Sequence, residues 1–372
     1  MVNSDADVVI CGGGVIGLAT AYYLGKRGVP SLVIEADSVA SGASGAAAGL
    51  LSQPTLTERH GPVGPLQRLS FDAHLELAGH LPEESDIDYQ FARGGMLQIA
   101  LTESEEREDR ARVDADRRAD LTTRWLEPGE ARELCGWIDL PIRGAVLPPE
   151  NAQLDAYRFS LALLLAAERF GAVLRTGRVT GVARSGDRLT GVYVDSELIP
   201  CSAAVFAMGP WTGAAAPWLE TAIPVEPLKG QIVQVRSTGP TPRYGFADHG
   251  DNYATPKASG LIYLGTTEER AGFDVSPTPA ARDQILAFAL RASAVLGEAE
   301  AVEQTACLRP LSADGVPILS SVPGLAGAFV GSGHGRKGVM QAPASGQILA
   351  QLVLGETPAL DLAPFDLRRF AG

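Results

Sequence analysis

The feature that most constrains the fold lies near the start of the chain, where three glycines in the pattern G-x-G-x-x-G separate an apolar run from a helical pattern. These glycines are Gly12, Gly14 and Gly17. The run DVVIC at residues 7–11 has the near-continuous apolar character of a buried parallel strand. Apolar side chains then recur at helical spacing over residues 15–27, and SLVIE at residues 31–35 is a second predicted strand. Together they predict a strand–helix–strand unit, and so an α/β fold with a parallel sheet.

Each of the three glycines has a physical role in a dinucleotide-binding turn. Gly12 permits a tight turn, Gly14 lets the backbone approach a pyrophosphate, and Gly17 lets helix and strand pack closely. The helix N-terminus offers free N–H groups to the phosphates. Glu35 lies 18 residues after Gly17 (35 − 17), where a carboxylate accepts hydrogen bonds from a ribose diol and repels a 2′-phosphate. The pattern predicts binding of FAD or NAD rather than NADP; a glycine-rich turn that binds nothing is the alternative.

The composition argues against several classes of function. With 31 basic and 44 acidic residues the net charge is −13, and such a surface repels nucleic acid and anionic membranes. The four cysteines form no CxxC pair and the five histidines no HExxH motif, so we expect neither a metal site nor a disulfide framework. No apolar run approaches the roughly 18 residues of a membrane span, and the N-terminus lacks the basic region of a signal peptide. We therefore expect a cytoplasmic protein without nucleic-acid or membrane partners, and leave homo-oligomers open.

The 372 residues suffice for about two domains. Patterns of α/β type occur at the start, middle and end of the chain, whereas residues 229–267 alternate β-branched and polar side chains as antiparallel strands do. We therefore expect a discontinuous nucleotide-binding domain with a mixed-sheet substrate domain inserted in pieces. The first domain is placed at residues 1–80, 145–215 and 300–372, and the second at residues 81–144 and 216–299. Helices are expected at residues 102–120 (highly charged and solvated), 157–170, 280–296 and 344–354.

Two further segments rich in small residues bear on the ligand. Residues 41–51, SGASGAAAGLL, are either a flexible linker or a loop and helix that a ligand approaches closely, and their position favours the second interpretation. Residues 305–346 contain a second glycine-rich loop with Gly333, Gly335 and Gly338. An NAD dehydrogenase does not need such a loop, whereas extended FAD needs a separate cradle for its ring system. Gly346 is expected to precede the start of the last helix, whose N-terminal dipole would favour the electron-rich reduced flavin.

The order and spacing of these motifs resemble the FAD-dependent glycine oxidase and D-amino-acid oxidase (DAO) family, most of all its glycine oxidase members. The resembling segments are GGGVIGLATAYYL, SGAAAGLL, RGGMLQIA, AAVFAMGPWTG, PLKGQIV, NYATPK, LGTT, LRPLSADGVP and GHGRKGVMQAPASG. The resemblance implies an α/β fold: an FAD-binding Rossmann-like domain of the GR2 type with an inserted mixed or antiparallel-sheet substrate domain. Besides the three fingerprint glycines, the implied FAD contacts are Val15, Ile16, Glu35, Ala36, Ala43, Ser44, Ala47, Ala48, Gly49, Leu50, Val179, Gly209, Trp211, Gly333, Gly335, Arg336, Lys337, Gly338, Val339 and Met340.

The family chemistry implied is oxidation of the C–N bond of glycine or an N-substituted glycine. A hydride passes from the carbon beside nitrogen to flavin N5, the imine hydrolyses to glyoxylate and an amine, and O2 reoxidises the flavin to give hydrogen peroxide. The expected partners are a small carboxylate-bearing amine and O2. A D-amino-acid or sarcosine-type amine oxidase or dehydrogenase is the alternative, and a flavin-binding module without turnover is a more remote one.

The resemblance also implies which side chains would hold the substrate. Arg309 occupies the carboxylate-binding position of the glycine oxidase pattern, where a guanidinium binds bidentately; a structural salt bridge is the alternative. Tyr253 matches a tyrosine whose hydroxyl contacts the same carboxylate, unless it is only a half-buried strand residue. Arg336 matches a second family arginine and acts through its charge or its backbone. Lys337 stands where the family often has Asn, which leaves its role open, and His334 fits a structural loop residue better than a base.

Two positions depart from the glycine oxidase pattern. Cys307 lies seven residues before Asp314 (314 − 307), where sarcosine oxidases carry their flavin-linking cysteine and glycine oxidases usually carry glycine. We favour a small buried cysteine and non-covalent FAD, with a covalent link as the alternative. Gly335 replaces a residue that is typically aromatic, and this loss of bulk predicts a pocket for a large substituent on the substrate nitrogen.

Overall fold

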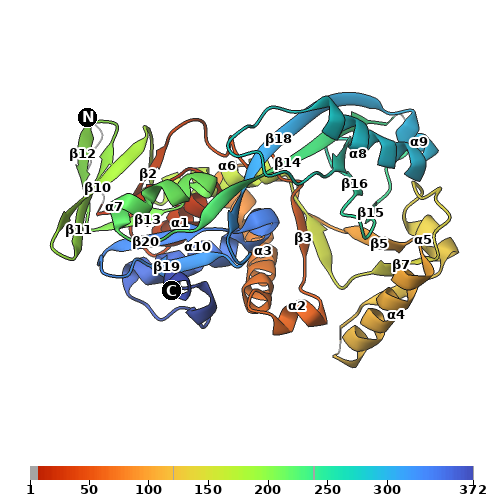
Figure 1. Ribbon diagram of the computed structural model, residues 1–372, viewed down its shortest axis with the longest axis horizontal. Helices are drawn as coiled ribbons and strands as arrows, with labels where there is room; N and C mark the ends of the chain where they lie inside the picture. Colours follow the sequence, from red (N-terminus) through yellow and green to blue (C-terminus); the bar gives the residue numbers. More distant parts are fainter. Residues whose placement is uncertain (1–6, 120, 238, 372) are drawn as a thin grey trace.

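Two sheets of different kinds dominate the molecule (Figure 1). The computed structural model describes residues 7–119, 121–237 and 239–371. One sheet has six strands, mostly parallel, and the other has eight strands, mostly antiparallel. The predicted α/β class is confirmed, and the fold is mixed as expected.

The six-stranded sheet contains the predicted strand–helix–strand unit at its centre. Its order is β19-β20-β13-β1-β2-β9, and only the β19–β20 pair is antiparallel. Alternate residues of β1 face opposite layers: Val8 and Ile10 join one hydrophobic core, whereas Val9 and Cys11 join another. Both faces are therefore buried, which explains the uninterrupted apolar run. The strands are β1 (Val8–Cys11), β2 (Ser31–Glu35), β9 (Val173–Thr176), β13 (Ala203–Phe206), β19 (Ile318–Ser321) and β20 (Ala328–Ser332).

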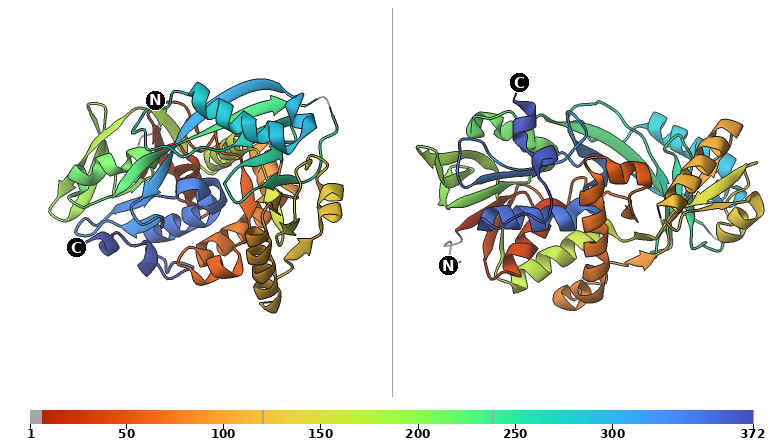
Figure 2. Two further views of the ribbon diagram at one scale, coloured as in Figure 1. Left: turned by 45° about the vertical axis from the view of Figure 1, so that its right-hand side comes forward. Right: turned by 90° about the horizontal axis from the view of Figure 1, so that it is seen from below.

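Different layers cover the two faces of this sheet. Four helices pack on one face, and Figure 2 shows them lying together. They are α1 (Val15–Gly25), α3 (Gly64–Ser85), α6 (Ala156–Arg169) and α10 (Gly338–Leu354). A small antiparallel sheet and two short helices cover the other face. These are β10 (Val179–Ser185), β11 (Arg188–Val194), β12 (Glu197–Pro200), η1 (Gly209–Ala215) and α7 (Ala216–Leu219).

Helix α10 begins six residues earlier than predicted, at Gly338 rather than residue 344 (344 − 338). Gly346 therefore lies inside the helix. The N-terminus of the helix is at Gly338 instead, so the role predicted for Gly346 beside the helix dipole is wrong. A Cβ atom on Gly346 would lie 2.6 Å from the backbone carbon of Ala19. This glycine thus allows α10 to cross α1 closely, and it is a packing residue.

Pro343 lies in the interior of α10, where its missing N–H leaves the carbonyl of Val339 without its helical donor. Nε2 of the buried His74, on α3, lies 3.0 Å from that carbonyl oxygen. Because a carbonyl can only accept, Nε2 carries the proton, and burial lowers the pKa of His74 to about 4. Ser70, one turn earlier on α3, accepts from the Ala344 N–H at 3.2 Å. One face of α3 thus completes the hydrogen bonding of α10.

The eight-stranded sheet has the order β18-β14-β17-β16-β15-β5-β7-β6, with a parallel pair at β15–β5. Helices on this sheet bury a third hydrophobic core. The strands are β5 (Met96–Ala100), β6 (Arg124–Leu126), β7 (Gly144–Leu147), β14 (Val225–Arg236), β15 (Gly245–Ala247), β16 (Tyr253–Pro256), β17 (Leu261–Gly265) and β18 (Glu300–Ser312). The helices here are α5 (Pro128–Leu134), α8 (Pro279–Ala292) and α9 (Ala294–Gly297). The single helix expected over residues 280–296 is thus two helices that meet at Ser293.

The remaining elements are short. A three-stranded sheet, β3-β8-β4, comprises Leu50–Ser52, Asn151–Gln153 and Ala92–Arg93. The other helices are α2 (Leu56–His60), η2 (Gly335–Lys337), η3 (Ala363–Phe365) and η4 (Leu367–Phe370). Residues 41–49 form turns ahead of β3 rather than the expected loop and helix.

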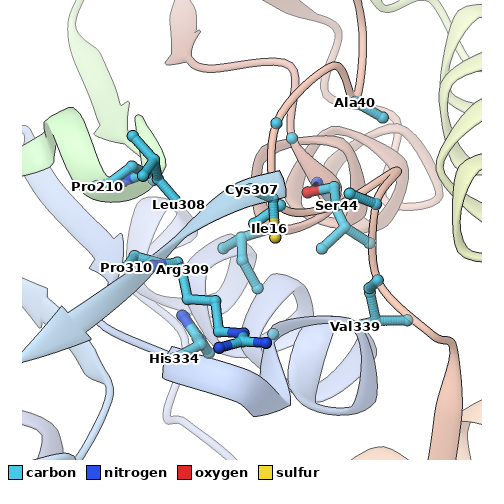
Figure 3. A pocket seen from close by; sticks show the side chains of 18 of the residues that line it. Ile16, Ala40, Ser44, Pro210, Cys307, Leu308, Arg309, Pro310, His334 and Val339 are labelled. Carbon is cyan, nitrogen blue, oxygen red and sulfur yellow. Dashed lines mark hydrogen bonds between the residues drawn. The ribbon is translucent and has the colours of Figure 1, made fainter. Parts of the chain in front are cut away.

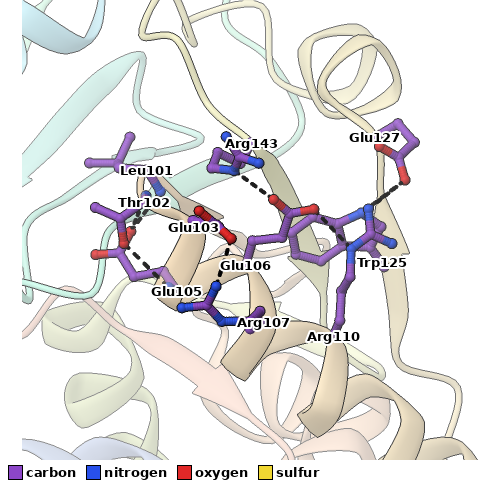
Figure 4. A network of polar contacts seen from close by, with 10 residues as sticks. All are labelled: Leu101, Thr102, Glu103, Glu105, Glu106, Arg107, Arg110, Trp125, Glu127 and Arg143. Carbon is purple, nitrogen blue, oxygen red and sulfur yellow. Dashed lines mark hydrogen bonds and ion pairs between the residues drawn. The ribbon is translucent and has the colours of Figure 1, made fainter.

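The charged segment forms α4 (Glu103–Arg118), as predicted; residue 120, its expected end, lies outside the described residues. Thr102 and Glu105 form a capping box at its start. Glu106 then accepts from Arg110 at 3.1 Å and from Arg143 at 2.6 Å (Figure 4). These exposed pairs each contribute little to stability, so α4 is a solvated helix held mainly by its caps and its sheet contacts.

Strand β18 bears on the proposed division into domains. We grouped residues 300–312 with the nucleotide-binding segments, but they pair with β14 in the eight-stranded sheet. By sheet membership this stretch belongs with the second set of segments. The division itself remains a proposal.

Candidate active site

A cavity of about 1070 Å³ lies where the two large sheets meet. The glycine fingerprint and the loop at residues 36–50 line one end of it, and β14, β16 and β18 line the other. The residues after β20 complete the wall, and Figure 3 shows Arg309, His334 and Cys307 around the space. The cavity therefore joins segments from the start, middle and end of the chain.

At the fingerprint end, the glycines are required by close backbone contacts. Gly12 has φ +118°, and a Cβ there would lie 2.3 Å from the carbonyl oxygen of Ala207. A Cβ on Gly17 would lie 2.1 Å from the carbonyl oxygen of Gly12. The first N–H of α1, from Val15, donates to Ser44 Oγ at 2.9 Å. Gly12, Gly14 and Val15 all line the cavity, so this loop forms a backbone cradle at the position that a pyrophosphate occupies in a dinucleotide site.

Glu35 closes the outer side of this cradle. One oxygen of its carboxylate accepts from the Gly13 N–H at 2.7 Å, and the other accepts from the Asp37 N–H at 2.9 Å. The side chain is thus fixed at the cavity wall, and each carboxylate oxygen keeps a lone pair for another donor. The geometry fits the predicted role of a ribose acceptor.

Most of the predicted cofactor contacts line the cavity. They are Gly12, Gly14, Val15, Ile16, Glu35, Ala36, Ala43, Ser44, Ala47, Ala48, Gly49, Leu50, Val179, Gly209, Trp211, Gly335, Arg336, Gly338, Val339 and Met340. Gly17, Gly333 and Lys337 do not. Gly17 packs beneath the loop, and Gly333 has φ +79° with Ser312 close by. The Lys337 ammonium turns away to Glu58 at 2.7 Å and Gln67 at 2.9 Å. These three residues therefore support the loops that line the cavity.

At the other end, the Arg309 guanidinium lies over the backbone of the neighbouring strand. A Cβ on Gly230 of β14 would lie 2.1 Å from its central carbon. Nη1 donates to the Thr267 carbonyl at 3.1 Å, and Nη2 donates to Thr266 Oγ1 at 2.8 Å. The side chain is 12% exposed. Arg309 is thus fixed in the cavity wall with donors to spare, because a guanidinium carries five N–H groups.

Tyr253 lies near this arginine and is arranged in the same way. It pairs with Gly265 of the adjacent strand, and a Cβ on Gly265 would lie 2.5 Å from the Tyr253 hydroxyl oxygen. Burial raises the pKa of Tyr253 far above its usual value, an effect that the charge of Arg309 only partly offsets. Its hydroxyl therefore stays protonated and can donate to an anion.

Arg336 is engaged by two carboxylates rather than standing free. It donates to Asp251 through two nitrogens, at 2.8 and 3.1 Å, and its Nε pairs with Glu268. Glu268 Oε1 also lies 3.6 Å from Nη1 of Arg309. Asp251 and Glu268 were not predicted as site residues, because neither belongs to a motif that we interpreted.

Gly230 and Gly265 were also missed, although both lie within quoted motifs. PLKGQIV contains Gly230 and LGTT contains Gly265. A glycine inside a strand often marks a close approach, and this was the available signal. Which neighbour approaches depends on the cross-strand pairing.

His334 lines the cavity but is not suited to act as a base. Its Nε2 lies 2.9 Å from Ser345 Oγ, and burial lowers its pKa to about 3. Its Nδ1 is buried and has no hydrogen-bond partner among the described residues. The ring is therefore neutral, and a buried nitrogen without a partner is one that a bound polar group would satisfy.

Cys307 and Trp211 also line the cavity. Burial raises the pKa of the Cys307 thiol, which disfavours the thiolate that a covalent flavin link requires. Trp211 is 45% exposed and stacks on Phe273 with ring centroids 5.7 Å apart. Within the described ranges, no helix is long and apolar enough to cross a bilayer, and no group of three or more candidate side chains gathers as a metal site would.

Comparison with known proteins agrees with this geometry. Residues 7–352 match the family model described as FAD dependent oxidoreductase (DAO). The chain is 30% identical to a glycine oxidase of Geobacillus kaustophilus over 367 residues, which cover 98% of this chain and 97% of that protein. It is 31% identical over 409 residues to the hydrogen cyanide synthase subunit HcnC of Pseudomonas aeruginosa, with coverage of 99% and 97%.

A solved structure is similar over the whole chain. The crystal structure of the glycine oxidase from Geobacillus kaustophilus has a TM-score of 0.93, at 30% identity, and the match covers 98% of each chain. The fold and the family predicted from the sequence are confirmed, and so is FAD as the cofactor. The glycine cradle, Glu35 and the large cavity are what an extended dinucleotide needs. This chain belongs to the DAO family of FAD dependent oxidoreductases.

Proposed function

We propose that this enzyme oxidises the C–N bond of glycine or of an N-substituted glycine. The observation that carries the proposal is the oriented Arg309 guanidinium beside Tyr253, in the cavity that also contains the dinucleotide cradle. A guanidinium and a protonated phenol are suited to bind one carboxylate. The similarity to a glycine oxidase supports an amino-acid substrate.

The side chains would act mainly by positioning. Arg309 would bind the substrate carboxylate through its remaining N–H groups, and Tyr253 would donate a further hydrogen bond. Holding the carboxylate at a fixed point fixes the adjacent carbon as well. Bound FAD supplies the two-electron acceptor that takes a hydride from that carbon. The imine formed then reacts with water to give glyoxylate and the free amine, and O2 takes the two electrons to form hydrogen peroxide.

Space near Gly335 favours a substituent on the substrate nitrogen. A Cβ at this position would meet only Leu311 Cδ1, at 3.8 Å. However, Gly335 has φ +53°, a conformation that favours glycine for a backbone reason as well. Substitution by Asn, which tolerates this conformation better than most residues, therefore tests the pocket with less strain than Phe.

The test is a substrate screen with two readouts. Glycine, sarcosine, a long-chain N-alkylglycine and D-alanine are mixed with the holoenzyme, and flavin bleaching is followed without oxygen while peroxide is assayed in air. We expect bleaching by at least one glycine derivative and little by D-alanine. Preference for D-alanine would overturn the proposal. A preference for free glycine, with the long-chain compound inert, would overturn the enlarged pocket alone.

A second candidate is suggested by the similarity to a hydrogen cyanide synthase subunit. In that case the same C–N oxidation would occur in one subunit of a larger assembly. If the enzyme is also a dehydrogenase, the alternative left open from the sequence, the electrons would pass to an acceptor other than O2. Rapid anaerobic bleaching combined with negligible peroxide formation in air would favour this candidate.

A further inference from the structure

Glu268 lies between the two arginines of the cavity. Its Oε1 is 3.6 Å from Nη1 of Arg309, and the same oxygen pairs with Nε of Arg336. Glu268 lies in the segment after β17, next to Thr266 and Thr267. An oxygen of each of these threonines accepts a hydrogen bond from Arg309. Glu268 is thus attached to the segment that orients the carboxylate-binding guanidinium.

The positive charges around this point are balanced without a ligand. Arg309 and Arg336 contribute two positive charges, and Glu268 and Asp251 contribute two negative charges. Asp248 also lines the cavity and adds a further negative charge, which the N–H groups of its own turn, at Gly250 and Asn252, stabilise but do not neutralise. His334 is neutral. A bare carboxylate entering here would add an unbalanced negative charge.

An amino acid brings the missing positive charge with it. The nitrogen of a glycine derivative is separated from its carboxylate carbon by one carbon atom. A carboxylate held on Arg309 therefore places the nitrogen beside the guanidinium, whose Nη1 lies 3.6 Å from Glu268 Oε1 behind the residues that line the cavity. The negative carboxylate of Glu268 attracts a positively charged substrate nitrogen, because water screens charges only weakly in a partly buried site. Glu268 would thus repel the substrate carboxylate and attract the substrate nitrogen.

We propose that Glu268 makes the site select zwitterionic amino acids over simple carboxylic acids. This inference rests on the proposed function, because it assumes that Arg309 binds the substrate carboxylate. Glu268 is a specificity-determining residue that acts partly through Arg309, and it neutralises a guanidinium that would otherwise bind any small anion tightly.

Asp251 provides a matched control. It pairs with Arg336 as Glu268 does, but no contact joins it to Arg309 among the described residues. Both Glu268→Gln and Asp251→Asn remove one negative charge and keep the shape of the side chain. Asp251 has φ +65°, and Asn tolerates this conformation. The two variants therefore separate an effect on Arg309 from a general change of charge.

The experiment compares two probes that differ in a single atom. N,N,N-trimethylglycine carries a fixed positive nitrogen, and 3,3-dimethylbutanoate has carbon in its place. Neither can form the neutral amine that hydride transfer requires, because the nitrogen of the first carries no proton to lose and the second has no nitrogen, so neither undergoes the proposed oxidation. Binding to the FAD-loaded protein is followed by the visible absorbance of the flavin, and the same spectrum shows whether each variant is folded. The measured quantity is the ratio of the two dissociation constants.

We expect wild type to prefer the cationic probe. Glu268→Gln should shift the ratio by roughly tenfold towards 3,3-dimethylbutanoate, and Asp251→Asn should shift it less than threefold. An unchanged ratio in Glu268→Gln, or an equal shift in Asp251→Asn, would overturn the inference while the proposed function stands. If wild type binds neither probe nor acetate, the proposed carboxylate site fails, and the inference fails with it.

Discussion

The two ends of the cavity are built in different ways. At the dinucleotide end, backbone groups of nearby residues form the site, and glycines at 12 and 17 keep that backbone compact. At the carboxylate end, side chains form the site, and each lies over a glycine of the neighbouring strand: Arg309 over Gly230 and Tyr253 over Gly265. The first pair of glycines thus serves the main chain, whereas the second pair makes room for functional side chains.

Because the two ends are built differently, substitutions should be able to impair FAD binding and substrate binding independently. A side chain added at the dinucleotide end should distort the cofactor cradle, whereas one added at the proposed carboxylate end should displace a proposed substrate-binding group and leave the cradle intact. The predictions below test that separation.

The largest effect is expected from Gly17→Ala. The added Cβ would lie 2.1 Å from the Gly12 carbonyl oxygen, so the cradle must distort. We expect the purified protein to carry less than about a tenth of the FAD of wild type, since the turn needs this close approach. FAD released by heat is measured by fluorescence. Gly79→Ala, where the added atom meets nothing within 4 Å, is the control and should retain FAD.

Gly230→Ala should act on the substrate alone. Its Cβ would lie 2.1–2.3 Å from the Arg309 guanidinium atoms, which must move away. Loss of a buried charge partner costs about 3–5 kcal/mol, so kcat/KM for the best substrate should fall by a hundredfold to several thousandfold, as for Arg309→Ala. FAD content should remain that of wild type. A parallel loss of FAD would show that the two ends are not independent.

Lys257 connects the two ends of the cavity. It directly follows β16, and its ammonium donates to the Ala48 carbonyl of the cradle loop. Burial lowers its pKa to about 8. Since the unfolded value is about 10.4, the unfolded state binds more protons between these values, and stability rises with pH there. The rise should approach about 3 kcal/mol and then level off. Burial raises the pKa of the four cysteines, which lowers the stability of both proteins over the same pH range. The Lys257 contribution should therefore appear in denaturant unfolding from pH 7 to 10.5 as a difference between wild type and Lys257→Met that grows with pH.

A smaller effect is expected from Glu35→Ala. The variant loses the charged acceptor of the Gly13 N–H, which is also the proposed acceptor for the ribose diol. Hydrogen bonds to charged groups contribute about 1.5–3 kcal/mol, so FAD affinity should fall about ten- to a hundredfold. Titration of apoprotein with FAD measures this. At saturating FAD, kcat should be close to that of wild type. An unchanged FAD affinity would show that Glu35 is not part of the cofactor site.

The smallest effect is expected at Cys307. Because burial raises the pKa of this thiol, we expect FAD to be bound without a covalent link. After precipitation with acid, the yellow colour should stay in the supernatant for both wild type and Cys307→Ser. Colour in the wild-type pellet alone would establish the bond.

The same contrast explains what the sequence could and could not predict. Gly12, Gly14 and Glu35 follow a pattern with fixed spacing, so their places at the cavity could be predicted before the fold was known. The partners of Gly230 and Gly265 depend on strand register, which local patterns do not specify. Glu268 and Asp251 meet Arg336 only through tertiary packing. Helix α10 was predicted too short because Gly338 and Pro343 disfavour helix, and packing against α1 and α3 overrides that tendency.

In α10, the side chain of His74 takes the place of the backbone N–H that Pro343 lacks, and this links two positions far apart in the chain. His74 is needed as a donor only because residue 343 is proline. An alanine at 343 would bond the Val339 carbonyl itself, and a leucine at 74 would then leave no buried group unsatisfied. In related sequences, the two positions are therefore expected to vary together: proline at 343 should occur with a donor at 74, and an apolar residue at 74 should occur only where proline is absent.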